Sequence, residues 1–149
     1  MNGDRRMSID FALAETRDAI AATWPVMHQL RPHLDAEAYL DRVLRLQAER
    51  DFRLARMNVD GEVVAVAGLR FGEWLHGGRY LEIEDFVTDE QCRSLGYGGQ
   101  FFDWIAALGR EAGCRHLRLL SGVQREAAHR FYRRKGMNLD AYYFSLDLD

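Results

Sequence analysis

A glycine-rich turn between residues 93 and 99 carries the clearest chemical signal in the sequence. It reads Arg93-Ser94-Leu95-Gly96-Tyr97-Gly98-Gly99 and lies between a strand-like and a helix-like apolar segment. Backbone N–H groups in the first turn of a helix lack partners within the helix and lie at the positive end of its dipole. Glycine lets an anion approach these groups, and arginine adds a forked donor. The spacing therefore indicates a phosphate-binding turn.

The turn departs from two common nucleotide-binding motifs. A dinucleotide fingerprint needs a third glycine where this chain has Phe101. A P-loop needs Gly-Lys-Ser/Thr, but the one lysine of the chain, Lys135, is followed by Gly136. A nucleotide-binding α/β domain is therefore disfavoured, while a turn that serves only helix packing stays open.

Two glutamates precede the turn on the strand-like segment Tyr80–Thr88. Strand periodicity predicts that Glu82 and Glu84 point to one face, and that Ile83 and Asp85 point to the other. Carboxylates in such positions can act as general bases, can hold a water molecule, or can belong to a solvated strand face. The residues alone leave these alternatives open.

Composition and charge exclude several other functions. Five histidines occur without an i,i+4 pair or an HExxH motif, and Cys92 and Cys114 form no CxxC, so no metal site is expected. The net charge of -3 argues against a nucleic-acid partner. No apolar run reaches the roughly 18 residues of a membrane span, so no membrane partner is expected. Two cysteines fit a reducing compartment, so we expect a cytoplasmic protein.

The 149 residues, 48% of them hydrophobic, predict a single globular domain over residues 1–149. The periodicity predicts the order β α α β β β α β α β, and thus an α+β (mixed α/β) fold with helices on both faces of one mixed sheet. Strands are expected at residues 8–13, 52–57, 63–69, 80–88, 117–119 and 142–148. Helices are expected from residue 16 to Pro32, from the N-cap Asp35 to about residue 46, and at 97–112 and 124–134.

A few single residues refine this prediction. Pro25 is expected to kink or split the first helix, and Asp60-Gly61 to form a hairpin turn. Gly68, inside a predicted strand, indicates a bulge or a close approach of another group. The last strand alternates cleanly, and its exposed edge would allow a homodimer, although the oligomeric state stays open.

Two motifs of the chain share their spacing with a known family. They are Arg93-x-x-Gly96-x-Gly98 and Ala128-x-x-Phe131-Tyr132-x-x-x-Gly136-Met137. These resemble the R/Q-x-x-G-x-G/A and A-x-x-F-Y-x-x-x-G-F motifs of the GCN5-related N-acetyltransferases (GNAT). The resemblance covers residues 53–148. It implies a GNAT-like single domain with splayed central strands.

The resemblance also implies an activity and a cofactor site. The implied enzyme is an acetyl-coenzyme A-dependent N-acetyltransferase that acts by direct attack of a primary amine of a small molecule or peptide, without a metal. The end of the strand would pair with the pantetheine arm, and the turn would bind the pyrophosphate. The implied cofactor-binding residues are Phe86, Val87, Thr88, Arg93, Ser94, Leu95, Gly96, Tyr97, Gly98, Gly99 and Phe131.

The implied reaction needs a base for the ammonium group and an acid for the departing thiolate. Relatives place a base, or a residue that holds a water, at the positions of Glu82 and Glu84, and Glu84 is favoured because it lies nearer the cofactor end. Tyr132 matches the tyrosine that protonates the thiolate. Trp74 is expected in a loop that lines the acceptor pocket. Arg125 stands where many relatives have Asn, and its role stays open.

A function of a different class remains an alternative. The chain could be a non-catalytic module that binds acyl-coenzyme A as a sensor or partner domain. The retained Tyr132 favours catalysis, because a degenerate binder would more often lose it. The identity of the amine cannot be derived from the residues.

Overall fold

The computed structural model describes residues 6–149. It divides the chain into two compact units, Met1–Arg118 and Leu119–Asp149. The expectation of one domain over residues 1–149 stays a prediction. No helix within residues 6–149 combines the length and the apolar composition needed to cross a membrane.

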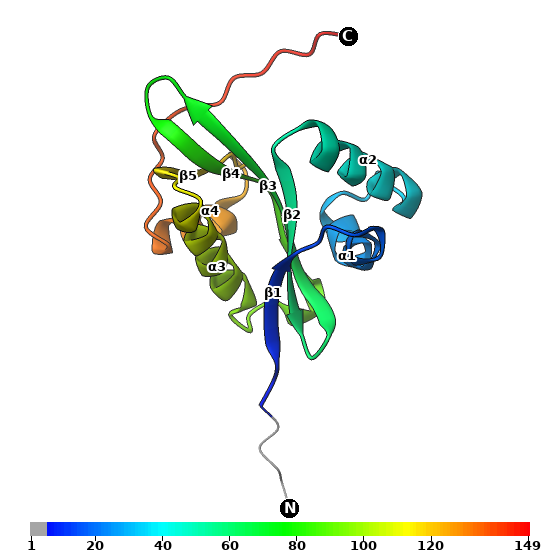
Figure 1. Ribbon diagram of the computed structural model, residues 1–149. Coiled ribbons are helices and arrows are strands. Elements are labelled where there is room, and N and C mark those ends of the chain that lie inside the picture. Colours follow the sequence, from blue (N-terminus) through cyan, green and yellow to red (C-terminus); the bar gives the residue numbers. More distant parts are fainter. Residues whose placement is uncertain (1–5) are drawn as a thin grey trace, which may run out of the picture. The chain divides into compact units, whose positions relative to one another are not determined.

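A sheet with the strand order β1-β2-β3-β4-β5 forms the frame of the first unit (Figure 1). The strands are β1 (Ile9–Leu13), β2 (Phe52–Val59), β3 (Glu62–Trp74), β4 (Gly78–Thr88) and β5 (His116–Leu119). The first four pair antiparallel in sequence order, and β5 follows a helical crossover to lie beside β4. Asp60 and Gly61 have φ values of 51° and 82°, as a type I′ hairpin turn requires, which confirms the predicted turn.

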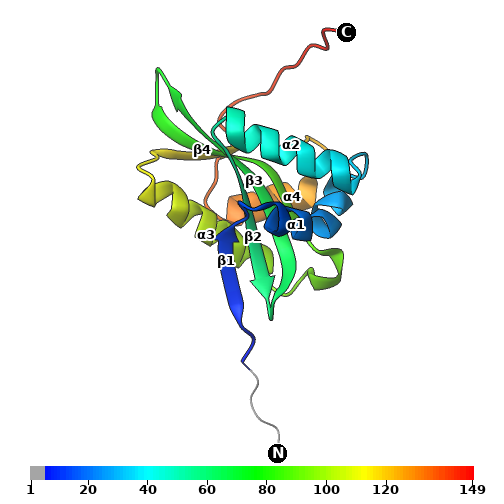
Figure 2. The same ribbon diagram turned by 45° about the vertical axis from the view of Figure 1, so that its right-hand side comes forward.

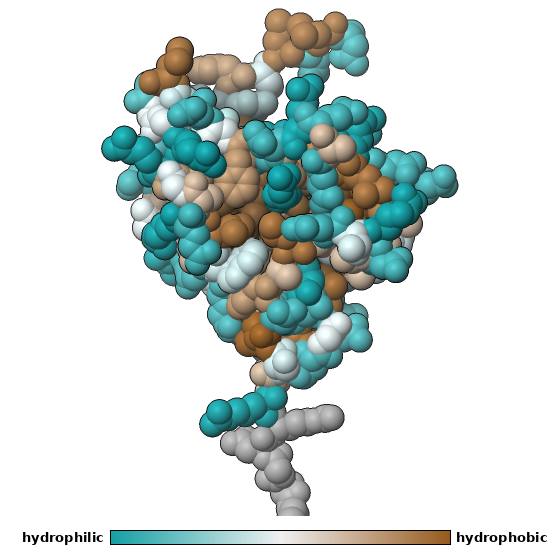
Figure 3. All heavy atoms as spheres, viewed as in Figure 1, coloured by the Kyte–Doolittle hydropathy of each residue, from teal (hydrophilic) through white to brown (hydrophobic). Residues whose placement is uncertain are grey.

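Helices cover both faces of this sheet, as predicted (Figures 1 and 2). Helices α1 (Arg17–Leu30) and α2 (Ala36–Glu49) lie on one face, and α3 (Tyr97–Glu111) lies on the other. A short 3-10 helix, η1 (Glu90–Cys92), connects β4 to α3. Figure 3 shows mainly hydrophilic residues over α1 and α2, as expected for helices that bury only one side. This confirms the α+β class with a mixed sheet.

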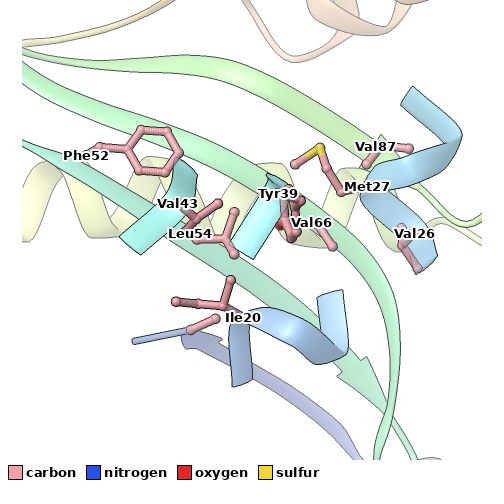
Figure 4. Packing of buried hydrophobic residues seen from close by; sticks show 10 residues of the cluster. Ile20, Val26, Met27, Tyr39, Val43, Phe52, Leu54, Val66 and Val87 are labelled. Atoms are coloured by element: carbon pink, nitrogen blue, oxygen red, sulfur yellow. The ribbon is translucent and has the colours of Figure 1, made fainter. Parts of the chain in front are cut away.

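The main hydrophobic core lies between the sheet and the pair α1 and α2 (Figure 4). Side chains from both helices and from β2, β3 and β4 meet there, namely Ile20, Val26, Met27, Tyr39, Val43, Phe52, Leu54, Val66 and Val87. Inside this core the Tyr39 and Thr23 hydroxyls form a hydrogen bond of 2.7 Å, and Thr23 also donates to the Ile20 carbonyl. The buried hydroxyls are thus paired, as burial requires.

Side chains cap the N-termini of both helices on this face. Thr16 accepts from the Ala19 amide and Asp35 accepts from the Ala38 amide, which confirms Asp35 as an N-cap. Pro25 lies inside α1, which runs unbroken from Arg17 to Leu30, so a split at this proline is wrong. The helix loses one backbone hydrogen bond there, while its apolar face stays packed in the core.

The second unit contains helix α4 (Glu126–Arg134), which ends before Gly136 with φ 88°, as predicted. The predicted strand at residues 142–148 is wrong, because residues 138–149 form neither helix nor strand. Its alternating apolar residues are exposed: Tyr142, Phe144, Leu146 and Leu148. Alternation specifies which face a strand would bury, but a strand forms only with a paired neighbour. A homodimer through this segment stays a prediction.

Candidate active site

A β-bulge in the β3–β4 pair decides which side chains of β4 share a face. Gly68 lies opposite Asp85, but Leu69 lies opposite Ile83, so Glu84 is an extra residue on β4. A bulge of this kind reverses the alternation of the residues beyond it. The prediction that Asp85 shares a face with Ile83 is therefore wrong.

The acids of β4 all lie on the face that α1 and α2 cover. Glu82 lies opposite Arg70 in the register of β3 and β4. The Arg70 guanidinium lies 5.7 Å from the ring centroid of Phe52 in the core. Asp85 forms an ion pair with Arg31, the C-cap of α1. Glu82, Glu84 and Asp85 thus form a line of three carboxylates, which we call the acidic row.

Gly68 makes the position of Asp85 sterically allowed. A Cβ atom at Gly68 would overlap Oδ2 of Asp85 and would lie 3.2 Å from the Phe52 ring. Any larger residue there would push the carboxylate away from the strand. Gly68 therefore marks both a bulge and a close approach, the two features that its place in the sequence predicted.

Each carboxylate of the acidic row is held by an arginine from a different element. The pairs are Arg70–Glu84 from β3, Arg118–Glu82 from β5 (3.2 Å) and Arg31–Asp85 from the end of α1 (2.8 Å). The hydrogen bond to Glu84 is the largest cause that raises the pKa of Arg70 above its ordinary value. Each carboxylate of the acidic row is thus paired with an arginine, while Glu84 is exposed to solvent. A glutamate that acts as a base must first leave its arginine.

An aromatic cluster lies next to the acidic row on the β3–β4 hairpin. The ring centroid of Trp74 lies 4.5 Å from that of Tyr80, and the Arg118 guanidinium lies 5.0 and 5.5 Å from these two rings. Tyr80 can lie flat across the hairpin because a Cβ atom at Gly72 would overlap its ring. Trp74 is the last residue of β3, so its predicted place in a loop is wrong, because β3 extends beyond the predicted end at Leu69.

The glycine-rich turn lies between η1 and α3. Gly96 is the N-cap of α3, with φ 81° and no side-chain cap, unlike the capped starts of α1 and α2. Ser94 also has a left-handed φ of 71°. Arg93, Ser94, Leu95 and Gly96 are all exposed. The first amides of α3 therefore begin at an exposed turn, and the helix dipole adds positive potential there.

The remaining residues of the turn have packing roles. The Tyr97 side chain is buried, so this residue can meet a ligand chiefly through its backbone. A Cβ atom at Gly98 would lie 3.3 Å from Oγ1 of Thr88, so glycine lets α3 start close to the end of β4. This close approach places the turn directly beside the end of β4.

The end of β4 uses its side chains for packing. Phe86 stacks on Phe101 of α3 at 5.8 Å, and Val87 is buried in the core. Strand β5 has four residues and β4 has eleven, so β5 can run beside only about a third of β4 at ~3.3 Å per residue. The ion pair of Arg118 with Glu82 places β5 beside the first part of β4. The splayed strands of the resemblance stay a prediction.

The C-terminal end of α1 contacts both the acidic row and η1. Arg31 binds Asp85, and Gln29, two residues earlier, contacts the segment that follows β4. The Gln29 side chain accepts from the Glu90 amide at 2.9 Å and donates to Asp89 at 3.3 Å. The end of α1 thus holds β4 at Asp85 and also holds the start of the segment that follows the strand.

In the second unit, α4 carries the other predicted site residues. The rings of Phe131 and Tyr132 meet edge to face at 5.6 Å. Burial raises the pKa of Tyr132 above its ordinary value, although the positive charge of Arg125 acts in the opposite direction. Tyr132 is therefore a protonated phenol at neutral pH.

The arginine partners and Asp85 are the site residues that sequence reasoning missed. Arg31 and Asp85 lie 54 positions apart, and the packing of α1 on the sheet brings them together. The one signal for Asp85 was Gly68 on the facing strand. Among residues 6–149, no group of three or more His, Cys, Asp or Glu side chains is arranged to hold a metal ion.

The chain is similar to known proteins in sequence and in fold. The profile of the Acetyltransferase (GNAT) family matches residues 13–137. Uncharacterized N-acetyltransferase YhdJ of Bacillus subtilis (strain 168) is 35% identical over 130 residues, which cover 87% of this chain and 92% of that protein. Aminoalkylphosphonate N-acetyltransferase of Salmonella typhimurium (strain LT2) is 30% identical over 137 residues, which cover 90% and 86%.

Among solved structures, the fold is similar to that of aminoglycoside N-acetyltransferase AAC(6')-Iy in complex with CoA. The TM-score is 0.82, and the match covers 99% of both chains at 15% sequence identity. At this identity the likeness concerns the fold alone.

Proposed function

The chain belongs to the GNAT family of acetyltransferases and is an N-acetyltransferase, and we propose that it transfers acetyl from acetyl-coenzyme A to a primary amine of a small molecule or peptide. The observation that carries the cofactor proposal is the exposed, uncapped start of α3 at Gly96. The relatives named N-acetyltransferases favour catalysis over the alternative of a non-catalytic acyl-coenzyme A binder.

The glycine-rich turn suits the anionic part of acetyl-coenzyme A. We propose that the backbone amides from Ser94 to Gly99 bind the pyrophosphate and that Arg93 adds a charge-assisted contact. Two left-handed residues, Ser94 and Gly96, turn the backbone sharply there, and the segment up to Gly96 is exposed. These features support an anion site made of backbone groups.

The thioester end of the cofactor is proposed to lie along the end of β4. The side chains of Phe86 and Val87 are packed. A pantetheine arm would therefore bind the backbone of residues 86–88. Phe131 on α4 is carried over from the family motif as a further contact. The coenzyme supplies an activated acetyl group, and the residues of the chain hold it and move protons.

Glu84 is the proposed base, with Glu82 as the alternative. The carboxylate accepts a proton from the ammonium group, and the neutral nitrogen then attacks the thioester carbonyl. The C–N bond forms as the C–S bond breaks, and the sulfur leaves as a thiolate. The arginine pairs imply that the substrate must compete with Arg70 or Arg118 for the chosen glutamate.

Tyr132 is the proposed acid that protonates the thiolate. The role is carried over from the family motif, and burial of the ring, which raises the pKa of Tyr132, keeps the phenol protonated at neutral pH. The family match over residues 13–137 includes the segments of both β4 and α4.

The acceptor class is proposed from a named relative, and the location is proposed from the cysteines. The Salmonella relative is named for aminoalkylphosphonates, which are small amines, and we extend the small-molecule class to this chain. Cys92 and Cys114 are both free thiols, which fits the reducing interior of the cytoplasm.

Coenzyme A binding tests this proposal with a matched pair of glycines. Gly61 and Gly96 have φ values of 82° and 81°, and a Cβ atom at either meets nothing within 4 Å. Gly61→Asp and Gly96→Asp therefore impose a similar backbone strain and the same added charge. Coenzyme A should raise the Tm of wild type and of the Gly61 variant, while Gly96→Asp and Arg93→Ala should weaken that rise.

Calorimetry with acetyl-coenzyme A decides the outcome. Absence of binding heat with the wild type at millimolar concentration would overturn the cofactor proposal. Equal affinity of the Gly61 and Gly96 variants would show that the turn only packs the helix.

A further inference from the structure

Arg118 is held in place by more than its carboxylate partner. Its guanidinium lies against the rings of both Trp74 and Tyr80, and the Tyr80 ring packs closely against Gly72. These contacts fix the guanidinium even when Glu82 moves away. Arginine carries five N–H donors, and the ion pair with Glu82 at 3.2 Å uses Nη2. The fork can therefore bind a second anion.

A pocket next to Trp74 is lined by basic side chains. This pocket, of about 440 Å³, lies at the tip of the β3–β4 hairpin, lined by Leu75, His76, Gly77, Gly78, Arg115 and His116. Its titratable lining residues are all basic. The two histidines also contact Trp74, with ring centroids 4.8 and 5.7 Å from it. Anions are thus favoured at this end of the hairpin, next to the acidic row.

The spacing along β4 relates the basic and the acidic ends. Arg118 reaches Glu82, and Glu84 lies two residues further along the strand. Two strand residues span about 7 Å. A molecule with an anionic group at Arg118 and an amine at Glu84 therefore needs only a short linker between the two.

We propose that Arg118, framed by Trp74 and Tyr80, binds an anionic group of the acceptor. The substrate class is then a small amine that carries a phosphonate, phosphate or carboxylate within about 7 Å of its nitrogen. This inference rests on the proposed acetyl transfer at the same site. Because the anion would replace Glu82 on Arg118, its arrival would also release a carboxylate next to the reacting amine. Peptide amines without a nearby anion would lack this anchor.

The competing interpretation is that Arg118 only fastens β5 to the hairpin. A fastening role predicts lower stability in Arg118 variants without any change in preference between acceptors. An anion-binding role predicts a change in preference. Arg79 offers a matched control, since it neighbours Tyr80 on β4 but alternation points it to the opposite face.

The first experiment compares two acceptors of similar length with acetyl-coenzyme A, 2-aminoethylphosphonate and neutral propylamine. The wild type and Arg79→Met should prefer the phosphonate in kcat/KM by about 10–100-fold, the size of one charge-assisted interaction. Arg118→Met should lose this preference. Arg118→Lys, which keeps the charge and part of the packing, should retain part of it. An unchanged ratio in folded Arg118 variants would overturn the proposal.

The second experiment needs no turnover. Methylphosphonate should bind the wild type in calorimetry and should fail to bind Arg118→Met. Glu82→Gln should bind it more tightly, because the competing carboxylate is gone, whereas a fastening role predicts no gain. If no amine is acetylated but methylphosphonate binds through Arg118, the proposed function fails and the anion site stands. If both amines are acetylated equally and methylphosphonate does not bind, the anion site fails and the function stands.

Discussion

The bulge divides β4 into two stretches that present different chemistry. Before Asp85, the strand turns Tyr80, Glu82 and Glu84 toward the face of α1 and α2, where arginines hold both glutamates. After Asp85, the side chains of Phe86 and Val87 are packed, and the backbone and the following turn are what a ligand can meet. One strand thus carries the proposed side-chain site and the proposed backbone site in succession.

The difference shows why one proposed site is easier to predict from the sequence than the other. A backbone site needs particular conformations, and glycine at Gly96 is a direct sign of one. A side-chain site needs partners from other strands, and no local spacing encodes them. Variants in the two stretches should therefore separate coenzyme binding from turnover.

The largest effect is expected from the acidic row. Glu84→Gln should lower kcat by about 10²–10⁴-fold, the usual size of general-base catalysis, with coenzyme A affinity near that of wild type. The deficit should shrink at high pH, where the amine is already neutral. Steady-state kinetics across pH measures both effects.

Glu82→Gln and the double variant complete this series. If Glu82 is the base, its single variant shows the large loss instead. Full turnover in both single variants and in the double variant would remove the acidic row from the chemistry, and the contrast between the two stretches of β4 would disappear.

A smaller loss is expected at Tyr132, which lies outside β4. Tyr132→Phe keeps the ring and removes the proton, so kcat should fall by about 10²-fold, at the lower end of general-acid effects. Tm and coenzyme A affinity should stay near wild type. Full kcat under conditions where chemistry limits the rate would mean that water or substrate supplies the proton and that Tyr132 only packs.

The smallest effect concerns the core beneath the acidic row. Burial raises the pKa of Tyr39 to about 12 from an ordinary value of 10.0, and the charge of Asp85 adds to the shift. The folded state thus holds this proton more tightly than the unfolded state. The stability linked to it is fully present below pH 10 and is lost as the pH rises to about 12, by roughly 2–3 kcal/mol.

Urea unfolding of the wild type and of Tyr39→Phe tests this dependence. The variant should lose about 1 kcal/mol at neutral pH with the hydrogen bond to Thr23, and its stability should fall less steeply at alkaline pH. Coenzyme A affinity should be unchanged in both. If the unfolding free energies of the two proteins fell equally with rising pH, the raised pKa of Tyr39 would be contradicted.

Much of the fold could be predicted because local signals agree with it. The N-cap Asp35, the Asp60-Gly61 turn and the left-handed Gly136 each stand at an element boundary that the structure confirms. Wrong predictions arose where long-range contacts determine the secondary structure. Pro25 stays within α1 because the packed face holds the helix together. The strand at residues 142–148 has the right alternation, but pairing depends on a neighbour that alternation does not specify.

Some residues of the candidate site could likewise be predicted from local signals, and others could not. The motif residues from Arg93 to Gly99 do form an exposed turn at the start of a helix, as their spacing predicted. Asp85 was assigned to the wrong face, because strict alternation ignores the extra residue of a bulge. The arginine partners of the acidic row come from β3, β5 and the end of α1, and only the assembled sheet with its packed helix brings them to the carboxylates.

The two contacts at the end of α1 bear on how this enzyme could be re-engineered. Gln29 holds the segment that leads into the glycine-rich turn, while Arg31 holds Asp85. A chimera that replaces α1 and α2 to obtain a new acceptor would therefore disturb the glycine-rich turn at the same time. Substitutions are better introduced at the tip of the β3–β4 hairpin, where Leu75 is fully exposed and is not part of the core.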